Sequence, residues 1–273
     1  MSHAINAAKG FFIGISLLIP GMSGGTMAII LGIYDDLIHA VSSFFKNVRA
    51  NTILLFTVGA GAVLGIFGFS HIISAILERF EIPTIYFFMG VICGGIPVLW
   101  HKIRPKDTSL RTPIRVTDWV WGGVGLAIAL LMMLRPGKLV DLAAHEGILA
   151  FVVLVIVGVF VAIALILPGI STTFFLLTLG LYERTLGAVK ALDIAFLLPL
   201  LLGALIGTIA TTKVLENLMQ RHPNPTYLAI LGFVVGSVAQ VFPGIPAGWE
   251  ILTSLLALAV GFLLMRVLEK KVA

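Results

Sequence analysis

The sequence has few charged residues. Only 11% of its 273 residues are Asp, Glu, Lys or Arg, and 59% are hydrophobic, whereas soluble domains carry about a quarter charged residues. Apolar stretches of about 20 residues, long enough to cross a hydrocarbon core of roughly 30 Å, recur along the chain. The longest polar interval, residues 101–118, is too short for a soluble domain. The composition excludes a soluble protein and predicts one all-α polytopic membrane domain over residues 1–273.

Cysteine and catalytic motifs are also scarce. The single cysteine, Cys93, lies in an apolar stretch and is expected to be a packing residue, which excludes an intrachain disulfide and a thiolate metal cluster. The chain has no HExxH motif, no paired carboxylates in a polar motif and no convincing nucleophile with its base. We therefore predict no enzyme, no metal and no cofactor. The first ten residues lack the features of a signal peptide, so the N-terminus is expected to be retained.

The chain contains an internal repeat. A shift of 148 residues superposes the segment beginning at Gly10 on that beginning at Gly158, and a shift of 142 superposes a second block. The matches include residue types that two apolar sequences rarely share by chance at fixed spacing: Pro20, Gly21, Ser23 and Tyr34 with Pro168, Gly169, Ser171 and Tyr182, then Gly61, Arg79, Pro83 and Gly90 with Gly203, Arg221, Pro225 and Gly232. We predict repeat 1 at about 5–134 and repeat 2 at about 147–268.

Each half is predicted to be a broken or re-entrant helical hairpin followed by three transmembrane helices. The expected spans are 53–77, 84–100 and 119–134 in the first half and 194–213, 226–243 and 251–267 in the second. Because three crossings are odd, the second half enters the membrane from the opposite side. This is the inverted-topology repeat of many secondary transporters.

The distribution of basic residues predicts the orientation, because Lys and Arg collect in cytoplasmic loops. With the N-terminus inside, 13 of the 18 Lys and Arg residues are cytoplasmic and five are outside, namely Arg79, Arg135, Lys138, Arg184 and Lys190. Both termini and the basic loop 101–118 are then cytoplasmic. Contact with anionic membrane lipids accounts for the basic pI, so no nucleic-acid partner is expected.

The hairpins are the predicted binding site. The arm from Gly10 to Ile19 spans only about 15 Å as a helix, so it breaks near mid-membrane at Pro20 and Gly21. Backbone N–H groups and hydroxyls around such a break favour an anion. The expected ligands are Ser23, Gly24, Gly25 and Thr26 in the first half and Ser171, Thr172 and Thr173 in the second. Alternatively, these small residues only allow helices to pack closely. In the second half, residues 148–167 are long enough to form a full span.

Ionisable residues at equivalent positions give further candidates. Arg79 and Arg221 can receive a phosphate at the two mouths, or can simply anchor helix ends in the headgroup region. Asp35, Glu183 and His71 are possible proton carriers, although the two carboxylates can equally lie at solvated helix ends. The four GxxxG spacings, such as Gly61 with Gly65, are expected to bring helix backbones together.

The hairpin sequence PGMSGGTMAIILGIYDDLI, with its weaker copy PGISTTFFLLTLGLYE, resembles a bacterial and archaeal family of polyprenyl-phosphate transporters. The resemblance covers essentially the whole chain. It implies that the protein moves undecaprenyl phosphate, a C55 lipid carrier, across the bacterial cytoplasmic membrane for reuse. One departure concerns the second hairpin, where Thr172 and Thr173 replace a Gly-Ser pair that is common in the family. A transporter or channel for a small anion remains the alternative, which a groove for the lipid tail would distinguish.

Overall fold

The computed structural model describes residues 3–19, 22–104, 113–133 and 147–272, without the side chains of 173, 174 and 268–272, and every described element is a helix. The elements of the first half are α1 (His3–Leu17), α2 (Gly24–Ile30), α3 (Tyr34–Ser42), the short 3-10 helix η1 (Phe44–Lys46), α4 (Val48–Ile103) and α5 (Val116–Leu131). The elements of the second half are α6 (Gly147–Ile166), α7 (Thr172–Leu179), α8 (Tyr182–Ala191), α9 (Ile194–Arg221), α10 (Pro223–Val241) and α11 (Glu250–Val272).

Several of these helices have the length and hydropathy needed to cross a membrane. Among the described residues five qualify, namely α4, α6, α9, α10 and α11, and a sixth span results if α2 and α3, bent by 117°, are taken together. The all-helical membrane fold is thus confirmed. α5 is apolar but shorter, and the end of its predicted span lies outside the described residues.

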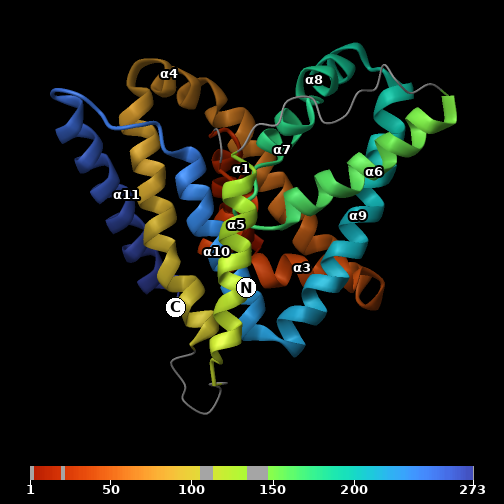
Figure 1. Ribbon diagram of the computed structural model, residues 1–273, viewed down its shortest axis with the longest axis horizontal. Coiled ribbons are helices and arrows are strands. Elements are labelled where there is room, and N and C mark those ends of the chain that lie inside the picture. Colours follow the sequence, from red (N-terminus) through yellow and green to blue (C-terminus); the bar gives the residue numbers. More distant parts are fainter. Residues whose placement is uncertain (1–2, 20–21, 105–112, 134–146, 273) are drawn as a thin grey trace.

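α4 contains two predicted spans in one element. A straight helix of 56 residues would be about 84 Å long, far more than a bilayer core. The helix breaks at Phe80, whose φ of −138° and ψ of 51° are not helical. Figure 1 shows the chain turning back near this break at the upper end of the molecule. The two arms, 48–79 and 81–103, correspond to the expected spans 53–77 and 84–100.

Glycines bring equivalent helices together in the two halves. A Cβ at Gly61 of α4 would lie 2.1 Å from the carbonyl oxygen of Ala7 in α1, and a Cβ at Gly203 of α9 would lie 1.9 Å from that of Val155 in α6. The two contacts are equivalent, because the repeat shifts match Ala7 to Val155 and Gly61 to Gly203. They confirm that the GxxxG glycines bring helices together.

Other glycines bring a helix of one half against a helix of the other half. A Cβ at Gly90 of α4 would lie 2.1 Å from the carbonyl oxygen of Leu258 in α11, and a Cβ at Gly232 of α10 would lie 2.1 Å from that of Gly122 in α5. The third span of each half therefore packs against the second span of the other. At the centre, every residue of α2 from Thr26 to Ile30 is buried.

A substitution at Gly61 tests this packing. Gly61→Ala should lower the free energy of unfolding by about 1–3 kcal/mol, because the methyl group overlaps the backbone of α1. Gly59→Ala is the matched control on the same helix, where a Cβ would have no neighbour within 4 Å, and it should leave stability unchanged or slightly raised. Thermal unfolding in detergent measures both. Equal melting temperatures of the two variants would contradict the packing.

Candidate functional site

Both hairpins break where the sequence predicts. α1 ends at Leu17 and α2 begins at Gly24, while α6 ends at Ile166 and α7 begins at Thr172. Ser23 is extended, with φ −96° and ψ 131°, and its side chain makes no capping hydrogen bond. Pro20 and Gly21, which mark the first break in the sequence, lie outside the described residues.

The two breaks are bonded to each other. The backbone N–H of Gly169 donates to Thr26 Oγ1 at 2.9 Å, and the Tyr34 hydroxyl donates to the carbonyl oxygen of Ile166 at 2.8 Å. A Cβ at Gly25 would lie 3.2 Å from the same carbonyl oxygen. Side chains and backbone of the first hairpin therefore satisfy and cover polar groups that the second break exposes.

A cavity of about 270 Å³ lies between the breaks, and we call it the central cavity. Its polar lining consists of Ser23 and Gly24 from the first hairpin and Ser171, Thr172 and Tyr182 from the second, and the rest of its wall is apolar. Ser23 and Ser171 are each only 5% exposed. The structure thus brings together four of the predicted ligands from the two halves.

The remaining predicted hairpin ligands have other positions. The hydroxyl of Thr26 is used by Gly169, and Gly25 packs against Ile166 and Pro168. The side chain of Thr173 lies outside the described residues.

The two predicted arginines lie away from the central cavity. Arg79 is the last residue before the break in α4, with its guanidinium carbon 5.7 Å from the Phe80 ring centroid, and Arg221 is the last residue of α9. Both are exposed. In Figure 1 the α4 break is at the upper end and the junction of α9 with α10 is at the lower end.

Of the three possible proton carriers, one is part of a polar cluster. The Asp35 carboxylate accepts from Lys102 Nζ at 2.5 Å and from the Tyr227 hydroxyl at 3.0 Å. His71 on α4 and Glu183 in the first turn of α8 are exposed. No group of three or more metal-ligating side chains occurs among the residues that the structure describes.

Two buried polar groups on α1 were not among the predicted site residues. Asn6 Oδ1 and Lys9 Nζ have no hydrogen-bond partner among the described residues, although the two side chains are 8% and 5% exposed. From the sequence, Lys9 was expected to be one of the 13 cytoplasmic Lys and Arg residues. The sequence does contain a sign of this burial. Lys9 lies one helical turn after Asn6 and directly before an apolar run, so the two side chains share one face of the helix.

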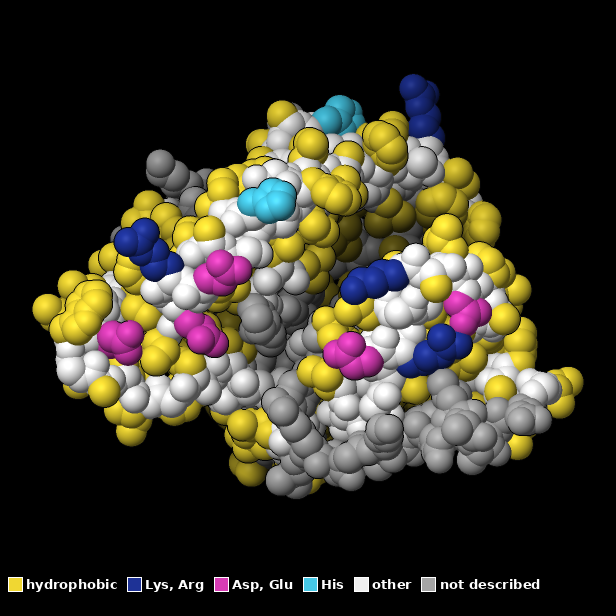
Figure 2. All heavy atoms as spheres, turned by 90° about the horizontal axis from the view of Figure 1, so that it is seen from above, with side chains coloured by type: hydrophobic (Ala, Val, Ile, Leu, Met, Phe, Trp, Pro, Cys, Tyr) yellow, Lys and Arg dark blue, Asp and Glu magenta, His cyan; other side chains and the backbone are white. Residues whose placement is uncertain are grey.

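The first hairpin makes contacts that its counterpart does not repeat. Tyr182 corresponds to Tyr34 and Leu18 to Ile166, but Tyr182 and Leu18 both line the central cavity. α3 packs against α9 of the other half, whereas α8 makes no comparable contact with the described part of α4. Seen from above, the molecule is hollowed between two parts that carry charged side chains of both signs (Figure 2).

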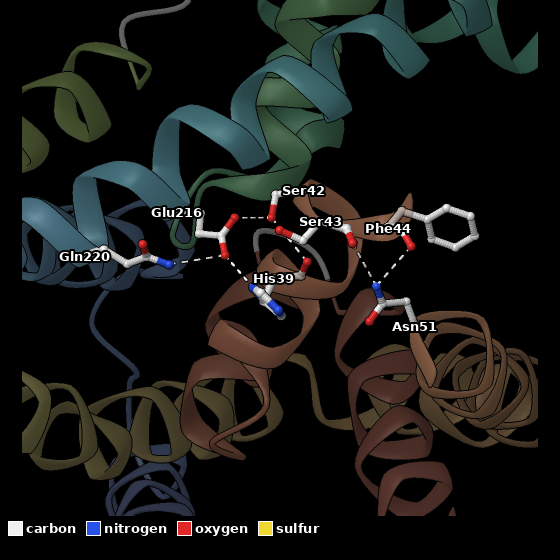
Figure 3. Close-up of polar contacts among 7 residues, drawn as sticks. All are labelled: His39, Ser42, Ser43, Phe44, Asn51, Glu216 and Gln220. Atoms are coloured by element: carbon white, nitrogen blue, oxygen red, sulfur yellow. Dashed lines mark hydrogen bonds and ion pairs between the residues drawn. The ribbon is translucent and has the colours of Figure 1, made fainter. Parts of the chain in front are cut away.

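A carboxylate on α9 holds α3 in place. Glu216 contacts His39 Nδ1 through one oxygen and the Ser42 hydroxyl through the other (Figure 3). Gln220, one turn further along α9, donates to the first of these oxygens at 3.3 Å. α3 and α9 are therefore in polar contact at the lower end, whereas the equivalent α8 and the described part of α4 make no comparable contact at the upper end.

Comparison with known proteins agrees with the resemblance seen in the sequence. A family model described as undecaprenyl phosphate translocase-like matches residues 13–254. A polyprenyl-phosphate transporter of Staphylococcus aureus is 33% identical over 269 residues, which cover 95% of this chain and 93% of that protein. A polyprenyl-phosphate transporter of Vibrio cholerae is 29% identical over 257 residues, covering 89% and 79%. No solved structure matches. The chain belongs to the undecaprenyl phosphate translocase-like family, and it is a multi-pass membrane transporter rather than an enzyme.

Proposed function

We propose that this protein moves undecaprenyl phosphate between the leaflets of the bacterial cytoplasmic membrane, and that the central cavity holds the phosphate. The observation that carries the proposal is that Ser23 and Gly24 of one hairpin and Ser171 and Thr172 of the other line a single cavity. Hydroxyl and backbone N–H groups in a low-dielectric site bind an anion well. Because α2 has only seven residues, these donors rather than a helix dipole supply the attraction.

A groove for the lipid tail favours this substrate over a small anion. A cavity of about 270 Å³ accepts a phosphate but not a 55-carbon chain. A second, mostly apolar cavity of about 550 Å³ lies between α5, α9 and α10, and Leu167 and Phe233 are in its wall. Leu167 directly precedes the second hairpin break, and the Phe233 backbone packs against Gly169 of that break. The first isoprene units of the chain can therefore lie in this groove while the phosphate occupies the central cavity.

The transport cycle that we propose is alternating access by two inverted repeats, about 5–134 and 147–268. The Tyr34–Ile166 bond and the α3–α9 packing close the lower end, whereas the equivalent Tyr182 and Leu18 both line the central cavity. In the second state these roles exchange. Arg79 and Arg221 then serve as phosphate receivers at opposite ends, and protonation of Asp35 would weaken its ion pair with Lys102.

The proposed orientation places the lower end in the cytoplasm. The end of α4, the start of α5 and the junction of α9 with α10 are all at the lower end in Figure 1, and all were predicted to be cytoplasmic. α8 and the α4 break are at the upper end and were predicted to be outside. Both termini are then cytoplasmic, and the structure corresponds to a state open to the outside.

Removal of both cavity serine hydroxyls tests the site. Ser23→Ala combined with Ser171→Ala should slow the exchange of undecaprenyl phosphate between leaflets of proteoliposomes by at least about tenfold, because hydrogen bonds to a charged group contribute about 1.5–3 kcal/mol each. Ser237→Ala is the control, since this serine is equally buried but bonds only within α10.

The same vesicles distinguish the rival function. If the native protein leaves lipid exchange at the rate of empty vesicles but carries inorganic phosphate, the small-anion transporter replaces our proposal. If lipid exchange is fast and the double serine variant retains it, the central cavity is not the site.

Loss of the Tyr34 hydroxyl tests the closure. In a Cys93→Ser background, a cysteine at Met22 in the central cavity should react with a membrane-impermeant maleimide mainly from the outside. Adding Tyr34→Phe should increase labelling from the cytoplasmic side several-fold, because the bond to Ile166 is lost. Tyr86→Phe, whose hydroxyl bonds to Gly244 instead, is the control. Unchanged cytoplasmic labelling in the Tyr34 variant would remove this bond from the closure.

A further inference from the structure

Another cavity lies outside the central site. It has a volume of about 870 Å³ and is enclosed by α3 and η1 on one side and α9 on the other, with Leu55 of α4 in its wall. We call it the α3–α9 groove. It is at the lower end of the molecule, where the first hairpin meets the second half.

The α9 wall of the groove changes character along its length. Leu205, Ile209 and Lys213 all line it and follow one another at intervals of four residues, so they form one stripe on the helix. From Leu205 to Lys213 the stripe extends about 12 Å. Its apolar part lies toward the start of α9 and its basic part toward the lower end, which is the orientation of a lipid whose tail points into the membrane and whose headgroup faces the lower surface.

The charged part of the groove contains two ammonium groups, those of Lys46 and Lys213, and one carboxylate, that of Glu216, which Lys46 partly balances, so positive charge is in excess. Glu216, the carboxylate in the lining, directs its two oxygens to His39 and Ser42 of α3 (Figure 3). Lys213 and Lys46 line the same space, and no ion pair joins Lys213 to another described residue. A lysine within an otherwise apolar span is uncommon and usually has a functional partner. An anionic headgroup complements the two ammonium groups.

We propose that the α3–α9 groove is a second binding site, which takes the phosphate of undecaprenyl phosphate at Lys213 and Lys46 and the start of its chain along Ile209, Leu205 and Leu55. The proposal rests on the proposed function. α3 forms a wall of the groove and also carries Tyr34, which closes the central cavity, so a lipid bound here lies beside the contact that must open. The groove is the place where the lipid docks on the cytoplasmic side.

Binding to a protein without the central site provides the test. The variant Ser23→Ala, Ser171→Ala is reconstituted in phosphatidylcholine nanodiscs, and binding of radiolabelled undecaprenyl phosphate is measured. Adding Lys213→Ala should weaken binding about tenfold, and Lys213→Arg should restore it because the charge is kept. Lys190→Ala, which removes an exposed lysine from α8, is the matched control and should bind as the parent does.

The source of the phosphate is tested by competition. Unlabelled phosphatidylglycerol at equal concentration should displace little of the labelled lipid. Equal displacement, equal binding by the Lys213→Ala and Lys190→Ala variants, or no binding to the double serine variant would each overturn the proposal. If binding depends on Lys213 but the native protein does not exchange the lipid between leaflets, the groove site stands and the proposed function fails.

Discussion

The structure depends on how two broken helices satisfy their backbone inside a membrane. Unpaired N–H and C=O groups are unfavourable in lipid, so a break is tolerated only when protein or a wet cavity covers it. Here the first hairpin satisfies backbone groups of the second break: Thr26 accepts from the Gly169 N–H, and Tyr34 donates to the Ile166 carbonyl. Ser23 and Ser171, one beside each break, line one cavity. The proposed binding site therefore lies where the two breaks meet.

The surrounding helices hold the breaks at this distance. Gly61 and Gly203 let the first arm of each hairpin lie directly on the first span of its half, and Gly90 and Gly232 join each half to the other. These contacts are rigid and nearly symmetric. The contacts of α3 are polar, because Asp35 pairs with Lys102 and Glu216 contacts His39. The equivalent helix α8 makes no comparable contact with the described part of α4. In the proposed transport cycle, the frame is kept and the polar contacts of α3 open to give the second state.

The sequence predicted the parts that depend on local chemistry. Pro, Gly and Ser at fixed spacing located both hairpin breaks, and the repeat predicted that Ser23 and Ser171 play equivalent parts. The sequence did not predict the Asp35–Lys102, Asp35–Tyr227 and His39–Glu216 contacts, which join residues 67, 192 and 177 positions apart. Such pairings depend on how α3 packs against α4 of its own half and against α9 and α10 of the other half. The burial of Asn6 and Lys9 was missed for the same reason, since a lysine near a chain end is ordinarily solvated.

The central claim is that the phosphate of the lipid occupies the cavity between the hairpin breaks. A cryo-electron microscopy structure of the protein in nanodiscs containing undecaprenyl phosphate tests this most directly. The account predicts phosphate density within hydrogen-bond distance of the hydroxyls of Ser23 and Ser171, with the chain leaving toward Leu167 and Phe233. The claim would be contradicted if lipid density were found elsewhere on the protein but never in this cavity, in any conformation observed.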